Sequence, residues 1–474
     1  MKRSNDFESK LKNKLRNDLS AGTPDVWVNI EERTRESMRQ TEGGPESRSG
    51  KGRRWLFRGA ASLAAVVILA AGFSFLAYKL PPLQAHAETI YDNGGHLNHI
   101  SSPAPSEDFI SSYNGFSLNL LNQLDKGGGN VFLSPAGIYL ALGMTYNGAQ
   151  GQTAAEFGKT LNSSKNLEGF DQECAGLQNL ITGSSRFTLA NSIWLNSSYS
   201  RNISEGFLDR NKNFFGSTVC TLDFSSSGTP GVINSWVKKN TGGRIDPSFK
   251  RFDPETVMTL INTVYFKSDW KQQFEGQNTR DGEFETPKGT KTVKFMHGEY
   301  TRYFENQNLQ GIILPYDDEK SSMLILLPRT DLTDMLGKLT ASDISAYVKG
   351  NINGETQAKL SLPRVNLRYQ ASLNDPLKAL GLKSAFDPDQ ADFSGMLKKN
   401  TGLYISAVTH MTYLAIDEKG TEAAAATTVM MAGSAAPMKT NIMNVDHPFL
   451  TAIVNNETGA ILFLGTVSDP SVSQ

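Results

Sequence analysis

The chain has 474 residues, of which 39% are hydrophobic and 20% are charged, and its formal net charge is -1 at pH 7. This composition predicts a globular protein with a substantial buried core. The near-zero net charge gives no electrostatic reason to expect a nucleic-acid partner, so we predict none. Cys174 and Cys220 lie in segments that contain apolar residues, and we expect two buried free thiols rather than a disulfide.

An uncharged run at residues 59–78 divides the N-terminal part of the chain. About twenty such residues suffice to cross a hydrocarbon layer of ~30 Å, so the run predicts a single transmembrane helix. Four basic residues precede it within eight positions, whereas Lys79 alone closely follows. The positive-inside rule then places the polar tail 1–58 in the cytoplasm and the globular part outside the cell membrane. A signal peptide cleaved at the small-x-small sequence Ala85-His86-Ala87 is the alternative.

Residues 79–105 are rich in Pro, Gly, Ser and Asn, which is typical of a linker. His96 and His99 stand there with HxxH spacing, but no cysteine or carboxylate cluster accompanies them, and we predict no metal site. From residue 106 to residue 474 the pattern is globular. It mixes helical and strand-like segments without a regular βαβ alternation, which predicts one α+β domain.

Local patterns predict several elements of this domain. Apolar residues recur every three or four positions through Phe109, Tyr113 and Phe116, which predicts a helix. A short strand is expected to end at Ser134, which suits the N-cap of a helix, while Pro135 suits the first helical position. The β-branched and apolar runs at 256–270 and 311–328 predict strands.

Catalytic motifs are scarce. No GxSxG, HExxH or GxxxxGK sequence occurs, and the match of Ser268 to Lys271 to the short SxxK pattern is of a kind expected by chance. An enzyme of this kind needs a nucleophile and a general base that act on the same substrate, and the sequence patterns identify no such pair. We therefore predict that the protein is not an enzyme and uses no cofactor.

The segment 417–438, DEKGTEAAAATTVMMAGSAAPM, is unusually rich in small residues. Read as a strand, it alternates faces, so charged Glu422 would point to solvent together with Ala424. Thr421 and Ala423 would then face the core, and no charged residue shares their face. Such a segment can slide between two strands without burying an ion, and Gly420 tolerates the backbone angles of a hinge.

The chain resembles the serpin family of protease inhibitors, of the prokaryotic type with an inhibitory hinge. The similarity spans residues 106–474 and is carried by seven segments in the family's order: NVFLSPAGIYLALGMTYNGAQGQT, INSWVKKNTGGRI, LINTVYFKSDW, LPRVNLRYQASLNDPLKALGLKSAFDPDQADFSGM, LYISAVTHMTYLAIDEKGTEAAAATT, VDHPFL and FLGTVSDP. Three positions depart from the family pattern. Gly137 stands where relatives usually have serine, Met411 replaces the lysine after the histidine, and Thr451 is unusually polar for its place.

This resemblance implies an α+β serpin fold of three β-sheets, eight or nine helices and an exposed reactive loop, following the predicted transmembrane helix. It also implies a suicide inhibitor of serine-type endopeptidases, whose cleaved loop inserts into the central sheet. The residues that it assigns to the hinge are Glu418, Gly420, Thr421, Glu422, Ala423, Ala424, Ala425 and Ala426. Those that it assigns to strand opening are Ser134, Asn262 and His410 beneath the parting strands, and Trp270 with Glu418 near their top.

The target class follows from the loop. With the spacing usual in inhibitory relatives, the bait bond falls at Ser434-Ala435, and a longer loop would shift it toward Ala436. Residues 420–438 contain no Lys or Arg, and small residues at the bond suit elastase-like or subtilisin-like proteases. Met430 or Met431 would instead admit a chymotrypsin-like protease.

Two other functions remain open at the level of sequence. A non-inhibitory serpin would act as a carrier, chaperone or storage protein, but its hinge would usually hold bulky, charged or proline residues. A membrane-anchored sensor would report extracellular proteolysis to residues 1–50. No glycosaminoglycan partner is expected, because residues 158–180 lack a basic stripe.

Overall fold

A computed structural model describes residues 88–91, 102–163, 165–182, 186–350, 356–399, 402–421 and 441–472. All of them belong to one compact unit, Pro81–Gln474. The predicted cytoplasmic tail and the apolar run 59–78 lie outside the described residues. Within the described residues, none of the helices is both long and apolar enough to cross a bilayer.

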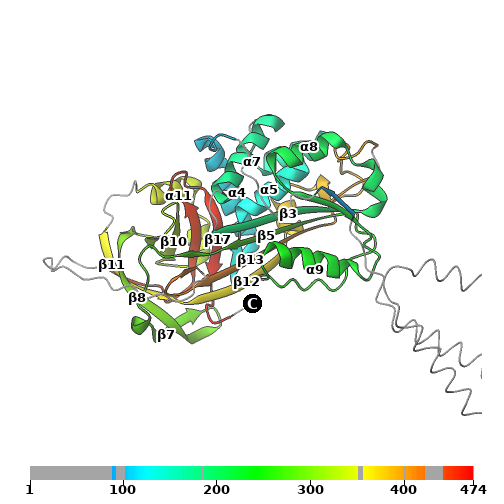
Figure 1. The fold of residues 1–474 in the computed structure, drawn as a ribbon. Coiled ribbons are helices and arrows are strands. Elements are labelled where there is room, and N and C mark those ends of the chain that lie inside the picture. Colours follow the sequence, from blue (N-terminus) through cyan, green and yellow to red (C-terminus); the bar gives the residue numbers. More distant parts are fainter. Residues whose placement is uncertain are drawn as a thin grey trace, which may run out of the picture. The chain divides into compact units, whose positions relative to one another are not determined.

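The central element is an eight-stranded sheet that runs through the middle of the fold (Figure 1). Its strands follow the order β1 (Glu88–Tyr91), β4 (Thr218–Leu222), β3 (Phe187–Asn196), β5 (Met258–Phe266), β13 (Ala407–Ile416), β14 (Gly420–Thr421) and β6 (Ser268–Asp269), while β12 (Val365–Ser372) also pairs with β13. The apolar run at 256–270 therefore forms β5 and β6, as the sequence predicts.

The remaining strands form a nine-stranded sheet. Its order is β15 (Asn441–Asn444), β11 (Thr356–Pro363), β8 (Gly289–Glu305), β9 (Leu309–Pro315), β10 (Ser321–Pro328), β16 (Phe449–Asn455), β17 (Ile461–Val467) and β2 (Val131–Leu133), with β7 (Arg280–Thr286) on β8. The described strands thus make two sheets where three are expected. The reason is β8, whose 17 residues pair with β7 and β11 along most of its length and with β9 at its end.

Nine α-helices occur among the described residues, which agrees with the expected number. They are α4 (Glu107–Leu124), α5 (Pro135–Tyr146), α6 (Gly151–Thr160), α7 (Leu167–Thr182), α8 (Glu205–Phe214), α9 (Thr229–Asn240), α10 (Leu332–Leu336), α11 (Ala341–Val348) and α12 (Asn374–Ala379). Ser134 is the N-cap of α5, and its hydroxyl accepts a hydrogen bond from the backbone N–H of Gly137. Pro135 takes the first helical position, as predicted.

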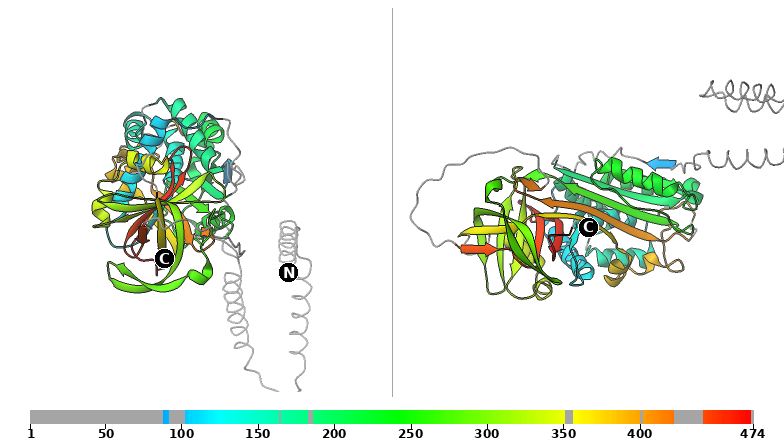
Figure 2. Two further views of the ribbon diagram at one scale, coloured as in Figure 1. Left: turned by 90° about the vertical axis from the view of Figure 1, so that its left-hand side faces the viewer. Right: turned by 90° about the horizontal axis from the view of Figure 1, so that it is seen from below.

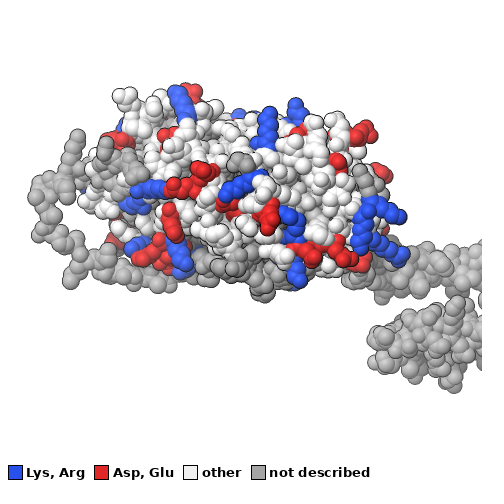
Figure 3. Space-filling model, turned by 90° about the horizontal axis from the view of Figure 1, so that it is seen from above, with Lys and Arg blue, Asp and Glu red and all other residues white. Residues whose placement is uncertain are grey.

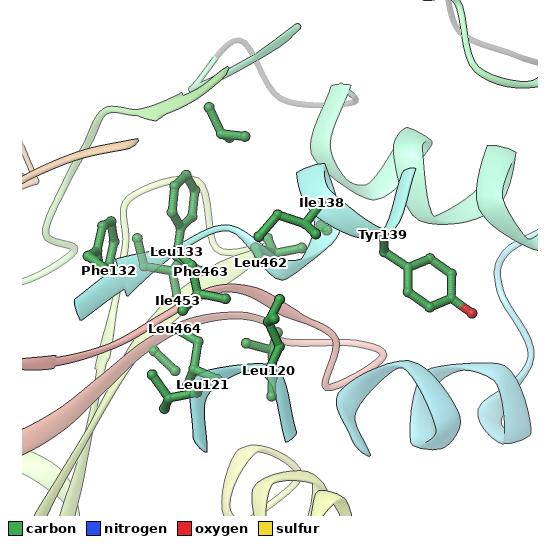
Figure 4. Packing of buried hydrophobic residues seen from close by; sticks show 14 of the residues in the cluster. Leu120, Leu121, Phe132, Leu133, Ile138, Tyr139, Ile453, Leu462, Phe463 and Leu464 are labelled. Carbon is green, nitrogen blue, oxygen red and sulfur yellow. The ribbon is translucent and has the colours of Figure 1, made fainter. Parts of the chain in front are cut away.

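Helices cover both faces of the eight-stranded sheet. The helices α5, α7 and α8 lie on one face, here named the inner face, and α9 lies on the other, the outer face (Figures 1 and 2). The main core lies on the inner face, where side chains of α4, α5, β2 and β17 interlock (Figure 4). A second apolar cluster beneath α9 includes Trp194, Ile261 and Met411.

Residues 88–91 correct the prediction that 79–105 is a linker throughout. They form β1, which pairs with the edge of β4 that faces away from β3. In this pairing Glu88 lies opposite Thr221, and Thr89 lies opposite Cys220. Ile90 is partly buried and packs against the main core, which is the apolar contact that a short strand needs. Both cysteines are buried and free, as predicted.

Candidate functional site

The strands β5 and β13 run parallel at the centre of the eight-stranded sheet, and we name the line between them the seam. Seven residue pairs hold it, from Ala407 with Thr259 to Tyr413 with Tyr265. Beyond that end, β14 lies between β13 and β6. Thr421 pairs antiparallel with Ile416 on one side, and β14 pairs antiparallel with β6 on the other. Two of the predicted hinge residues, Gly420 and Thr421, therefore occupy the position of a strand inserted at the top of the seam.

Both hinge residues are closely fitted there. The Thr421 side chain is 1% exposed, and its hydroxyl lies 2.8 Å from the hydroxyl of Tyr316. A Cβ atom on Gly420 would lie 2.1 Å from the backbone oxygen of Ser268, so only glycine can take this place without moving β6. The predicted hinge residues that follow Thr421, Glu422 to Ala426, and the predicted bait bond Ser434-Ala435 lie outside the described residues.

Trp270 holds the chain just before the hinge. Its indole Nε1 donates a hydrogen bond of 2.9 Å to the backbone oxygen of Asp417, and its backbone N–H donates to the oxygen of Lys419. The indole also stacks on Tyr316, with ring centroids 4.7 Å apart and an interplanar angle of 12°. One buried aromatic pair thus contacts both the turn before the hinge and the hinge threonine.

Glu418 anchors the same turn through its side chain. The carboxylate accepts hydrogen bonds from the Arg364 guanidinium and from the Thr279 hydroxyl, and its side chain is 12% exposed. Burial alone would raise the pKa of this carboxyl, but the hydrogen bonds from Arg364 and Thr279 outweigh burial, so the pKa is lowered. The backbone oxygen of Glu418 accepts a further bond from the N–H of Phe274.

Ser134, Asn262 and His410 meet on the inner face of the seam. The Nδ1 atom of His410 lies 2.5 Å from Oδ1 of Asn262, and its Nε2 accepts a hydrogen bond of 3.0 Å from the backbone N–H of Ser134. Full burial lowers the pKa of His410 to about 3, so the ring is neutral, with its proton on Nδ1. Asn262 also donates to Asn191 on β3. The cluster therefore links β13, β5, β3 and the start of α5.

The structure shows the surroundings of the three residues that depart from the family pattern. A Cβ on Gly137 would lie 2.5 Å from the Asn262 amide, so the absence of a side chain lets α5 approach β5 closely. Met411 is 1% exposed and fills the apolar cluster beneath α9. The buried Thr451 hydroxyl has no hydrogen-bond partner among the described residues, and nothing in the structure explains the polar choice there.

Several contacts of this site could not be foreseen from local patterns. Arg364, Tyr316 and Thr279 hold the hinge, but they are distant in sequence from Glu418 and Thr421. Only the sheet register brings them together. Arg364 does lie within the segment LPRVNLRYQ, which is part of one of the segments that resemble the serpin family. The resemblance alone assigns no role to Arg364.

Comparisons with known proteins agree with this architecture. The family model Serpin (serine protease inhibitor) matches residues 111–470. An uncharacterized serpin-like protein of Thermococcus kodakarensis is 35% identical over 376 residues, which cover 76% of this chain and 85% of that protein. The leukocyte elastase inhibitor of Homo sapiens is 32% identical over 77% of this chain and 100% of its own length.

Solved structures show the same relationship. The crystal structure of the thermophilic serpin tengpin in its native state has a TM-score of 0.74 and 31% sequence identity, and the match covers 81% of this chain and 100% of tengpin. The architecture around the seam and the family match over most of the globular part lead to one conclusion. The chain belongs to the serpin family.

Proposed function

We propose that this serpin inhibits serine-type endopeptidases by trapping them covalently during insertion of its reactive loop. The observation that carries the proposal is the placement of Gly420 and Thr421 between β13 and β6. Insertion of the segment that follows would continue a strand that has already begun. The small, uncharged residues predicted on its inner face would enter the core without burying an ion.

The sheet supplies a reason for insertion to be favourable. The seam is a parallel pairing, and parallel pairing is slightly less stable per residue than antiparallel pairing. A strand continuing from Thr421 would be antiparallel to both of its neighbours. Insertion therefore exchanges one parallel interface for two antiparallel ones, and it roughly doubles the number of strand–strand hydrogen bonds along the seam.

The chemistry belongs to the protease. Its serine oxygen attacks the carbonyl carbon of the bait residue, the peptide bond breaks, and the new N-terminus leaves with the proton that the protease's histidine donates. The ester that remains joins the protease to the hinge side of the loop. Insertion then carries the ester away from its original position, so the trap succeeds when insertion is faster than hydrolysis of the ester.

Elastase-like or subtilisin-like proteases are the proposed targets. The small residues around Ser434-Ala435 support this choice, because such proteases accept little bulk before the bond. The name of the human relative, leukocyte elastase inhibitor, also supports it. We propose no glycosaminoglycan partner. Lys165, which precedes α7, is paired with Glu173, and acidic and basic side chains are interspersed on the face shown in Figure 3.

The sequence further supports a location outside the cell membrane, with residues 59–78 as the tether. Protease added to intact cells should then cut the loop near Ser434 and spare residues 1–50. Full protection of the loop would contradict this placement. Soluble protein that begins at Glu88 would favour the cleaved signal peptide.

The decisive experiment is incubation of the full chain with elastase, subtilisin, chymotrypsin and trypsin. We expect a complex with elastase or subtilisin that survives SDS, and a released fragment whose N-terminus is Ala435 or Ala436. A fragment that begins at Thr440, with trypsin as the best target, would overturn the target class. Cleavage without any stable complex would favour a non-inhibitory serpin.

A further inference from the structure

Four side chains form a row across the seam on the outer face of the sheet. Tyr265 and Tyr413 are a register pair of β5 and β13, and their rings stack with centroids 6.3 Å apart and an interplanar angle of 21°. The Arg244 guanidinium lies 5.9 Å from the Tyr265 ring centroid, and the Arg368 guanidinium lies 6.0 Å from that of Tyr413. The row joins the loop after α9 to β5, β13 and β12.

This row lies on the opposite face from the His410 cluster. Successive side chains of a strand alternate faces, so Tyr413, three residues after His410, points the other way. The same holds for Tyr265 and Asn262 on β5. Consistent with this, Tyr413 packs against the apolar cluster beneath α9. The seam is thus held on its inner face by a hydrogen bond and on its outer face by an aromatic stack.

Opening the seam separates these two rings and leaves the outer contacts of the row in place. A strand inserted between β5 and β13 would increase their separation from about 4.8 Å to about 9.6 Å, which abolishes the ring contact. Arg244 keeps its place on Tyr265, and Arg368 keeps its place on Tyr413, because each pair lies on one side of the seam. The Tyr265–Tyr413 stack is therefore the part of the row that insertion must break.

We propose that the Tyr265–Tyr413 stack is a clasp that sets the rate at which the seam opens, and that the two tyrosines act as positioning residues for the trapping reaction. This inference rests on the proposed function, because insertion competes there with hydrolysis of the ester. A stronger clasp lengthens the life of the uncleaved native form and sends more molecules to cleavage without trapping. A weaker clasp shortens the life of the native form and lowers the share of molecules that are cleaved without trapping.

The test uses the full chain and a synthetic peptide with the sequence of residues 422–434, which can occupy the opened seam below Thr421 without any protease. We expect Tyr265→Val and Tyr413→Val each to raise the rate of peptide uptake by about two- to tenfold. The double variant should gain no more than either single variant, because both remove the same contact. Tyr265→Phe and Tyr413→Phe keep the rings and should keep the parent rate.

A matched control separates this role from general stability. Tyr347 stacks on Phe304 with centroids 4.7 Å apart, and that pair joins α11 to β8 away from the seam. Tyr347→Val should lower the unfolding temperature without raising the rate of peptide uptake. The clasp variants should raise the uptake rate by more than their loss of unfolding temperature accounts for.

Unchanged uptake rates in the valine variants, or strictly additive effects of the two, would overturn the clasp. If those variants fail to fold, Tyr265→Leu and Tyr413→Leu carry the test, because leucine fills more of the space than valine and still removes the contact between the two rings. A small rise in uptake supports the clasp, and no rise contradicts it. The proposed function fails separately if the parent chain takes up peptide but traps no protease. A parent chain that takes up no peptide contradicts both.

Discussion

The hydroxyl groups of Thr421 and Tyr316 lie 2.8 Å apart in a fully buried position at the top of the seam. Tyr316 is also stacked on Trp270, which holds the turn before the hinge through Asp417. The first hinge side chain that points inward is therefore already part of the core, and it is bonded to the same aromatic pair that fixes the preceding turn.

Thr421→Arg should convert the inhibitor into a substrate. The guanidinium would have to enter a site that is 1% exposed, and removing an unpaired charge from water costs several kcal/mol. The loop should still be cleaved, but the stable complex should be lost. Thr421→Val is the matched control, because it keeps the shape and removes only the hydroxyl. Complex formation by Thr421→Arg at the parent's efficiency, measured on SDS gels, would exclude strand insertion as the mechanism.

The register of β14 predicts a contrast between neighbouring alanines. Thr421 pairs with Ile416 and Ser268, so an unbroken strand places Ala424 opposite Tyr413 and Tyr265 on the outer face. Ala425 then comes opposite Thr412 and Val264, both buried.

Ala425→Glu should therefore abolish trapping, since insertion would bury a carboxylate in the core. Ala424→Glu should be tolerated, because its carboxylate would emerge on the outer face near the Arg244 and Arg368 cations. The measurement is the number of inhibitor molecules consumed per protease molecule trapped. Equal losses for the two variants would show that the strand does not insert in this register.

The free energy of unfolding should decrease as the pH is lowered, because His410 is buried in its neutral form. Burial lowers its pKa to about 3, whereas an unfolded histidine titrates near 6.5. Between those values the unfolded chain binds one more proton than the native one. The contribution is therefore fully present above about pH 6.5, and it falls by about 1.4 kcal/mol per pH unit below that. Denaturant midpoints at pH 7.5 and 5.5 measure it. His410→Gln should remove this part of the slope, and an unchanged slope would contradict the assignment.

The ion pair of Arg364 and Glu418 should stabilise the top of the seam. Arg364→Glu would place two carboxylates together and should lower the free energy of unfolding by about 1–2 kcal/mol, the Arg364 side chain being half exposed. The double change Arg364→Glu with Glu418→Arg should restore part of the loss. Denaturant unfolding of all three variants tests this, and a double variant no better than the single one would argue against the pairing.

Local patterns predict elements but not the contacts between them. The strands β5, β9 and β10 and the N-cap Ser134 follow from runs of apolar or β-branched residues and from helix-start chemistry. Strand β1 does not, because four residues within a stretch rich in Pro and Gly carry too little alternation. Its strand character comes from pairing with β4.

The candidate site shows the same division. A hinge of small residues is visible in the sequence, since its function requires that composition. The stack of Tyr265 on Tyr413 joins positions far apart in the chain, and only the register of two parallel strands brings the rings together. The joining of two expected sheets likewise depends on where the long strand β8 changes partners, which composition does not specify.

Strand β1 begins at Glu88, directly after the small-x-small sequence Ala85-His86-Ala87. Processing at that bond would make the first residue of the strand the new N-terminus and would leave the edge of β4 covered. A tethered form and a released form would then share the same folded unit. A cut after Tyr91 would have a different effect from processing after Ala87, because it would separate β1, which covers the edge of β4, from the rest of the domain. The bare edge of β4 could then pair with another chain, so such a product should associate as its concentration rises.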